Sequence, residues 1–118
     1  MTTTLVAVYG TLKKGFGNHH LLQTSKFIAA GSISGHRLYQ SGIPYVVCDA
    51  TSPYTVAVEV YEVSPATLER LDSLEGHPDW YRREVTSVQL SSGETVNAAV
   101  YKMRNQPYNT VENTSGEY

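Results

Sequence analysis

The chain has 118 residues, of which 41% are apolar and 17% charged, and this composition fits one globular domain with a single core. Nine Lys and Arg against eleven Asp and Glu give a formal charge of −2, which argues against a domain held mainly to nucleic-acid phosphates or anionic lipid. Cys48 is the only cysteine, so an internal disulfide is excluded. No targeting segment and no apolar run of about 20 residues is present, so we expect a cytoplasmic protein without membrane attachment.

The first half of the chain is typical of short strands. Residues 5–9 form an apolar run that ends at a glycine, as a buried first strand does. Residues 27–39 predict one long bent strand, with Gly31 and Gly35 as bulge or bend positions. After the turn residues Ser-Gly-Ile-Pro, residues 45–48 predict a further short strand.

The second half adds three longer strands. Residues 56–63 alternate, with the valines at 56, 58 and 60 on one face and Tyr61 and Val63 on the other. Residues 83–90 and 95–102 are joined by Ser-Ser-Gly-Glu, which is typical of a β-hairpin. We therefore expect about six strands.

One substantial helix is predicted between Ser64 and Gly76. Ser64 is a natural N-cap, Pro65 occupies the favoured first position, and Gly76 can end the helix in the left-handed conformation. About six strands with one main helix predict an α+β fold: a small mixed, mostly antiparallel β-barrel with the helix packed against it. We expect a single domain over residues 1–118.

The end of the chain, residues 103–118, is polar and shows no strand or helix pattern. It carries Tyr108 and Tyr118, and Pro107 stiffens the segment beside the first of these tyrosines. Aromatic anchors on a polar segment favour a flap over a pocket. The alternative is a loose tail, which is the commonest fate of terminal segments.

A carboxylate falls on the apolar face of the predicted helix. At about 100° per residue, Leu68, Leu71 and Leu74 form the stripe that faces the core, and Glu75 lies inside this stripe. Burial and the negative end of the helix dipole both raise the pKa of an inward carboxyl group, which suits a proton carrier. The alternative is that the last turn frays and Glu75 points into water.

Residues 9–15, Tyr-Gly-Thr-Leu-Lys-Lys-Gly, follow the first strand. A strand that runs into glycine and then turns can present successive main-chain N–H groups to an anion. The spacing is not that of a Walker loop. The alternative is an ordinary turn with two solvated lysines.

Other catalytic or metal-binding patterns are weak. The four histidines show no metal-ligand spacing, so no metal site is expected. Cys48 lies in an apolar strand and is interpreted as a small core residue. No Gly-x-Ser-x-Gly motif is present, so an esterase-type triad has no support.

Two motifs together resemble a known family. Residues 9–15 with Asn-His-His-Leu-Leu at 18–22 resemble the opening of the γ-glutamylcyclotransferase-like family, particularly its small γ-glutamylamine cyclotransferase branch. Residues 71–83, Leu-Asp-Ser-Leu-Glu-Gly-His-Pro-Asp-Trp-Tyr-Arg-Arg, are similar to the second signature of that family. The resemblance covers residues 5 to about 101, and it implies a small mixed β-barrel with flanking helices.

The resemblance also implies an activity and a site. The substrate would be a γ-glutamyl amine, whose α-amino group attacks its own γ-carbonyl to release 5-oxoproline and a free amine or amino acid, without cofactor or metal. Glu75 matches the family's catalytic acid/base. The positions that match substrate-binding residues are Tyr9, Gly10, Thr11, Leu12 and Tyr81.

Two alternative functions, both non-enzymatic, remain. A non-catalytic module on the same fold would hold a small molecule or dock on a protein, although such a module has no need of a buried Glu75. A barrel that binds single-stranded nucleic acid through its tyrosines is disfavoured by the charge of −2 and by the lack of a basic stripe. None of these readings specifies the leaving amine or an oligomeric state.

Overall fold

The computed structural model describes residues 2–118, in which eight strands, one α-helix and one 3-10 helix are found. The strands are β1 (Thr4–Val8), β2 (Lys26–Ser34), β3 (His36–Ser41), β4 (Ile43–Cys48), β5 (Thr55–Val63), β6 (Arg82–Leu90), β7 (Thr95–Lys102) and β8 (Val111–Glu112). The helices are the 3-10 helix η1 (His19–Leu22) and the α-helix α1 (Pro65–Glu75). No helix in the described part of the chain has the length and apolar character needed to cross a membrane.

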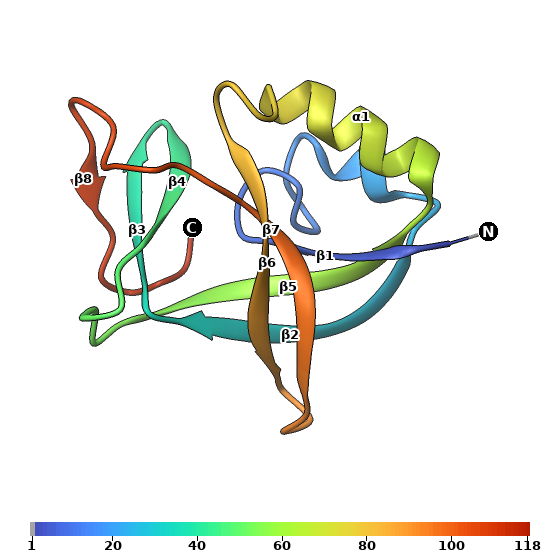
Figure 1. Cartoon of the computed structure of the whole chain (residues 1–118), viewed down its shortest axis with the longest axis horizontal. Helices are drawn as coiled ribbons and strands as arrows, with labels where there is room; N and C mark the ends of the chain where they lie inside the picture. Colours follow the sequence, from blue (N-terminus) through green and yellow to red (C-terminus); the bar gives the residue numbers. More distant parts are fainter. Residues whose placement is uncertain (1) are drawn as a thin grey trace.

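Five strands close into a barrel in the order β1-β5-β2-β6-β7 (Figure 1). Every neighbouring pair is antiparallel except β7 and β1, which pair in parallel at Val6 and Ala99. Beside the barrel lies a three-stranded sheet in the order β4-β3-β8. The predicted α+β class and mixed, mostly antiparallel barrel are therefore confirmed, with two more strands in the described residues than expected.

The predicted long strand is two strands, β2 and β3. Gly35 adopts a positive φ of 68° between them, so the chain turns out of the barrel into the small sheet. Gly31 is not a bend, because it lies inside β2, where a Cβ atom would come 2.6 Å from the main-chain oxygen of Gln89 in β6. The register shift of β2 lies instead between Phe27 and Ala29.

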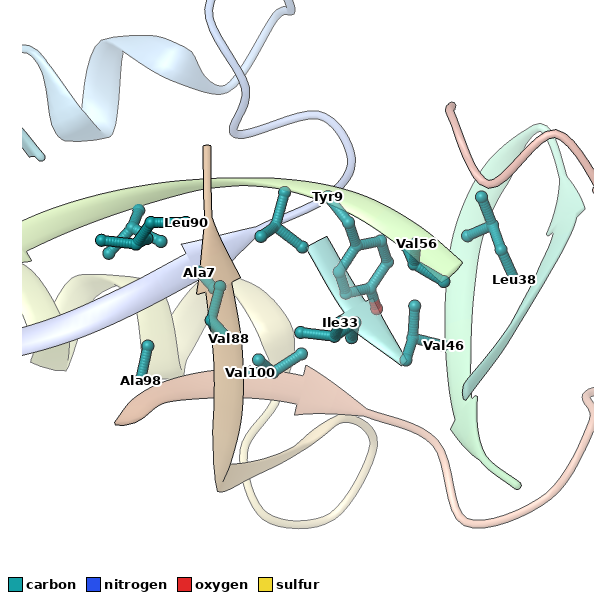
Figure 2. Packing of buried hydrophobic residues seen from close by; sticks show 12 residues of the cluster. Ala7, Tyr9, Ile33, Leu38, Val46, Val56, Val88, Leu90, Ala98 and Val100 are labelled. Atoms are coloured by element: carbon teal, nitrogen blue, oxygen red, sulfur yellow. The ribbon is translucent and has the colours of Figure 1, made fainter. Parts of the chain in front are cut away.

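The core consists of two buried clusters that share the strands of the barrel. On β5, Val56, Val58 and Val60 belong to the inner cluster, which extends to the small sheet (Figure 2). Tyr61 and Val63 belong to the cluster beneath α1 and η1, so the predicted alternation of faces is confirmed. Alternate residues of β1, β5 and β7 therefore support either the barrel interior or the helix.

Helix α1 begins and ends where its sequence predicts. The side-chain oxygen of Ser64 accepts a hydrogen bond from the main-chain N–H of Thr67 at 3.2 Å, and Pro65 is the first helical residue. Gly76 ends the helix with a φ of 67°. Because the left-handed conformation favours glycine, this residue fixes the point at which the chain leaves the helix.

The segment 103–118 is docked on the domain rather than free of structure. Strand β8 pairs with β3, and the main-chain N–H of Asn113 donates to the oxygen of Leu38 at 2.7 Å. Gly116 is buried, and its main-chain oxygen accepts a hydrogen bond from Ala57 of β5 at 2.8 Å. The interpretation as a loose tail therefore does not fit these contacts, and the role of a flap stays a prediction.

The two tyrosines of this segment differ in their surroundings. Tyr108 is 92% exposed, so the expectation that it anchors the segment is wrong. Tyr118 packs its ring 5.6 Å from that of Phe16, and its hydroxyl donates to the main-chain oxygen of Gly42. Its main-chain oxygen accepts a hydrogen bond from the buried ammonium of Lys13 at 3.2 Å. The segment thereby reaches the loop that follows β1.

Candidate active site

A pocket of about 170 Å³ opens between the loop after β1, the start of β4 and the last turn of α1. All six residues predicted for the site line this pocket, namely Tyr9, Gly10, Thr11, Leu12, Glu75 and Tyr81. Sequence reasoning did not assign Asn18, Pro44, Trp80 and Tyr101 to the site, and they line it as well. The fold thus brings the two motifs, which are about sixty residues apart in the sequence, to one cavity, while the roles of their residues stay predictions.

The loop after β1 is held in a fixed shape by Asn18. The main-chain N–H of Asn18 donates to the main-chain oxygen of Thr11 at 3.0 Å, and its side-chain amide donates to the Thr11 hydroxyl at 2.9 Å. Asn18 makes no side-chain cap for the helical turn that follows. Within residues 2–118, the main-chain N–H groups of Gly10, Thr11 and Leu12 donate to no protein acceptor. These groups are available to an anion in the pocket.

Gly10 is required by a close approach. A Cβ atom at this position would overlap the ring of Pro44 on β4. Pro44 in turn accepts a hydrogen bond through its main-chain oxygen from the hydroxyl of Tyr81 at 2.7 Å. The glycine therefore lets three separate segments meet at one wall of the pocket.

Glu75 is the last residue of α1 and faces the pocket. The predicted stripe is only partly confirmed, because Leu71 is fully buried and Leu68 half-buried, whereas Leu74 is 39% exposed and lines the pocket beside Glu75. The last turn of α1 has thus passed beyond the core, although it is helical to its end and does not fray. Burial raises the pKa of Glu75 from 4.5 to about 7.

The tyrosines of the pocket hold their protons. Tyr9 packs in the cluster drawn in Figure 2, and its hydroxyl donates to the main-chain oxygen of Tyr101 at 2.7 Å. The hydroxyl of Tyr81 donates to Pro44, and that of Tyr101 donates to a carboxylate. Burial raises the pKa of all three tyrosines. Among the titratable side chains that line this pocket in the described chain, Glu75 is therefore the one that exchanges a proton near neutral pH.

An ion pair anchors the last turn of α1 to the barrel. Arg83 at the start of β6 donates from Nε and Nη2 to the two carboxylate oxygens of Asp72, at 2.8 and 3.0 Å. The Tyr101 hydroxyl donates to the same carboxylate at 2.6 Å. Burial alone would raise the pKa of Asp72, but the hydrogen bonds from Arg83 and Tyr101 outweigh burial and lower it. Asp72 lies one turn before Glu75, so this pair fixes the position of the catalytic candidate.

Residues 76–81 connect α1 to β6, and Trp80 and Tyr81 of this connection line the pocket. The main-chain N–H of Tyr81 donates to the main-chain oxygen of Glu75 at 3.2 Å, and that of Trp80 donates to Gly76 at 2.9 Å. The ring of Trp80 is 49% exposed and lies 5.1 Å from the ring of Tyr81. Asp72, Trp80 and Arg83 all belong to the motif at 71–83, which was the available sequence signal for them.

No group of three or more His, Cys, Asp and Glu side chains gathers in a metal-binding arrangement among residues 2–118. Cys48 is exposed at the end of β4, so its interpretation as a core residue is wrong. It does not line the pocket that holds Glu75. The polar groups of this pocket include one carboxyl group, main-chain N–H groups and tyrosine hydroxyls.

The raised pKa of Glu75 predicts a pH-dependent effect on stability. The stability that the protonated carboxyl contributes is fully present below pH 4.5 and is lost as the pH rises through about 7. We expect Glu75→Gln to unfold at the same temperature as the wild type at pH 4 and at a higher temperature at pH 8. The difference in unfolding free energy at pH 8 should be at most about 3 kcal/mol.

Thermal unfolding by circular dichroism at both pH values checks this expectation. Glu69→Gln is the matched control, because Glu69 is an exposed residue of the same helix. The unfolding temperature of the control should differ from that of the wild type by the same amount at both pH values. An equal pH response in the two variants would contradict a buried Glu75.

Comparisons with known proteins show the family of the chain. Residues 6–118 match the family model described as "Gamma-glutamyl cyclotransferase, AIG2-like". A Methanocaldococcus jannaschii protein named "Putative gamma-glutamylcyclotransferase MJ1514" is 48% identical over 98 residues, 81% of each chain. Gamma-glutamylaminecyclotransferase C of Danio rerio is 36% identical over 121 residues, 89% of this chain and 78% of the relative.

A solved structure shows the same fold. The crystal structure of an AIG2-like protein from Mus musculus superposes with a TM-score of 0.83 at 27% identity, over 92% of this chain and 82% of the mouse chain. The family match covers nearly the whole chain, and the M. jannaschii relative exceeds 30% identity over most of it. The chain belongs to the gamma-glutamyl cyclotransferase, AIG2-like family.

Proposed function

We propose that this protein is a cofactor-free γ-glutamylcyclotransferase, which converts a γ-glutamyl amine into 5-oxoproline and a free amine or amino acid. The observation that carries this proposal is the carboxyl of Glu75, whose pKa burial raises to about 7, in the same pocket as the open N–H groups of residues 10–12. The names of the family and of the relatives support the same class of reaction. A cytoplasmic location stays a prediction of the sequence.

The loop at residues 10–12 is the candidate site for the α-carboxylate of the substrate. Its three N–H groups have no protein acceptor in the described chain, and hydrogen bonds from such groups to a carboxylate are stronger than those between neutral partners. Asn18 fixes the loop through Thr11, so the N–H groups need no rearrangement when an anion binds.

The size of the pocket favours the glutamyl half of the substrate. A cavity of about 150 Å³ is known to accept benzene, and the volume here is about 170 Å³. Such a pocket holds a group of a few carbon atoms with its polar ends, not a whole dipeptide. The amine that leaves would then lie toward the rim at Trp80 and Leu74, both of which are partly exposed.

Glu75 is the proposed base and acid of the reaction. The substrate's α-ammonium must lose a proton before its nitrogen can attack, and a carboxylate with a pKa near 7 accepts that proton at neutral pH. The nitrogen then bonds to the γ-carbonyl carbon and closes a five-membered ring. Glu75 returns the proton to the leaving nitrogen as the original amide C–N bond breaks. The ring nitrogen, which still carries two protons, then passes one of them through Glu75 to the released amine, which departs as an ammonium ion. Glu75 is left as a carboxylate, so charge and atoms balance over the cycle.

The protein has little further work to do because the nucleophile and the electrophile belong to one molecule. Well-oriented intramolecular reactions reach effective molarities on the order of 10⁵ M or more. The neutral tyrosines of the pocket contribute shape, since their hydroxyl protons are committed to protein acceptors. A non-catalytic binding module would use the same pocket but would not depend on the proton of Glu75.

Replacing Glu75 by glutamine tests this function. We expect Glu75→Gln to lose ~10²- to 10⁴-fold in kcat, because glutamine has nearly the same size and cannot accept a proton. Release of 5-oxoproline from γ-glutamyl amines and γ-glutamyl dipeptides is the measurement. In the wild type, kcat/KM should rise with pH and level off above about 7. Glu69→Gln is the control, and turnover near the wild-type rate in folded Glu75→Gln would sink the mechanism.

Gly10 should tolerate no side chain. We expect Gly10→Ala to raise KM at least tenfold, because its Cβ atom would displace Pro44 and with it the loop that holds the carboxylate. Gly17→Ala is a matched control, since a Cβ atom at Gly17 would meet nothing within 4 Å. Steady-state kinetics give the KM of both variants, and their melting temperatures show whether each is folded. An unchanged KM in Gly10→Ala would show that the loop is only a connector.

Arg83 should act through the position and charge of Asp72. We expect Arg83→Met to lower kcat about tenfold or more and to move the acid limb of the pH profile above 7, since the unpaired Asp72 carboxylate then opposes ionisation of Glu75. Arg83→Lys keeps the charge and should restore the pH profile in part.

Arg70→Met is the control for Arg83, because Arg70 is exposed and its one side-chain hydrogen bond is to Thr67 at 3.4 Å. Measured pH profiles that coincide in Arg83→Met and the wild type would contradict a positioning role.

A further inference from the structure

A second pocket of about 510 Å³ holds a buried lysine without a partner. Lys102, the last residue of β7, lines this pocket and is only 6% exposed. Within residues 2–118 it takes part in no ion pair and no side-chain hydrogen bond. Most of the residue is withdrawn from water, and no carboxylate of the described chain lies within ion-pair distance of its ammonium group. The structure therefore leaves a positive charge that a ligand could balance.

The neighbour of Lys102 does not supply that balance. His36 of β3 is buried, its Nδ1 lies 2.6 Å from the main-chain oxygen of Ser34, and its Nε2 has no hydrogen-bond partner in the described chain. Burial first and the charge of Lys102 second lower the pKa of His36, against the effect of the hydrogen bond to Ser34. A neutral imidazole cannot compensate a cation, so His36 does not balance the charge of Lys102.

Further charged side chains surround the same pocket. Arg82 lies opposite Lys102 in the β6–β7 ladder, and Arg104 follows two residues after Lys102. Neither arginine forms an ion pair with a carboxylate in the described chain. Asp79 and Glu84 also line the pocket, so three cations face two carboxylates and the formal excess is one positive charge. This excess suits one small anion and not a polyanion.

We propose that the second pocket binds a small oxyanion, either a carboxylate or a phosphate, with Lys102 as its central contact. Trp80 lines both this pocket and the one that holds Glu75, so the bound anion would lie against the wall of the active site. The anion is either free in solution or carried as a carboxylate on the leaving half of a substrate. Only the second source rests on the proposed cyclotransferase function, and the anion site itself does not.

Trp80 is the only tryptophan of the chain and lines both pockets, so its fluorescence reports that an anion binds, and NMR then shows at which pocket. Inorganic phosphate and acetate are titrated separately at constant ionic strength, with chloride as the balancing ion. We expect a saturable change in the wild type and an affinity at least about tenfold weaker in Lys102→Met, because a charge-assisted contact is lost. Lys102→Arg keeps the charge and should retain most of the affinity, which also guards against a folding defect in Lys102→Met.

Lys26→Met is the matched control, because Lys26 is exposed at the start of β2 and lies outside the pocket. Amide NMR spectra locate the anion, since residues 102–104 should shift with both anions, whether or not acetate also shifts residues 10–12. The proposal is wrong if neither anion gives a saturable response, if Lys102→Met binds as tightly as the wild type, or if residues 10–12 alone respond.

Turnover of two substrate sets then identifies the source of the anion. γ-Glutamyl amides with and without a carboxylate on the leaving amine are compared in the wild type and in Lys102→Met. If Lys102→Met loses kcat/KM only for the carboxylate-bearing substrates, the pocket binds the leaving half. If Lys102→Met keeps the wild-type kcat/KM for both substrate sets while the wild type binds phosphate, the pocket binds a free anion. If no substrate yields 5-oxoproline, the proposed reaction fails, and the phosphate and acetate titrations still decide the second pocket.

Discussion

The carboxyl of Glu75 lies at the end of a helix in a pocket that removes much of its contact with water, and burial raises its pKa to about 7. Such a placement destabilises the ionised form, so the surrounding structure has to hold the last turn of α1 in place. The Asp72–Arg83 ion pair and the left-handed Gly76 provide this restraint from either side of Glu75. The destabilisation is what makes the group useful as a proton carrier.

The barrel serves this site by bringing distant segments together. Strand β1 delivers the loop at residues 10–12, β4 delivers Pro44, and α1 delivers Glu75, so three parts of the chain form one cavity. Alternation on β7 extends the same logic, because Tyr101 lines the active-site pocket while the next residue, Lys102, lines the second pocket. Two binding regions can therefore share the rim formed by Trp80.

Local features of the fold could be predicted from the sequence because their causes are local. The cap at Ser64, the end of α1 at Gly76 and the two faces of β5 follow from neighbouring residues and strand or helix periodicity. Helical spacing predicted that Glu75 faces inward. That Glu75 and residues 9–12 belong to one site was predicted only from the resemblance of two motifs to one family.

The features that sequence reasoning missed depend on contacts between distant segments. The sequence predicts a bend at Gly31, but a glycine is needed there because β2 and β6 approach each other closely, which no local pattern shows. Segment 103–118 docks through main-chain hydrogen bonds and through side-chain contacts with residues far away in the sequence, such as that of Tyr118 with Phe16, and no local pattern shows either. The apolar neighbours of Cys48 predict a buried residue. Its strand, β4, is an edge strand of the small sheet, and Cys48 is exposed there.

The proton affinity of Glu75 is the quantity on which the proposed function depends. It can be measured directly by following the ¹³C chemical shift of the glutamate carboxyl groups against pH, with Glu75→Gln used to assign the resonance. The structure predicts that this carboxyl titrates with a pKa of about 7. A titration midpoint near the ordinary value of 4.5 would show that the group is open to water and would contradict its role as the proton carrier.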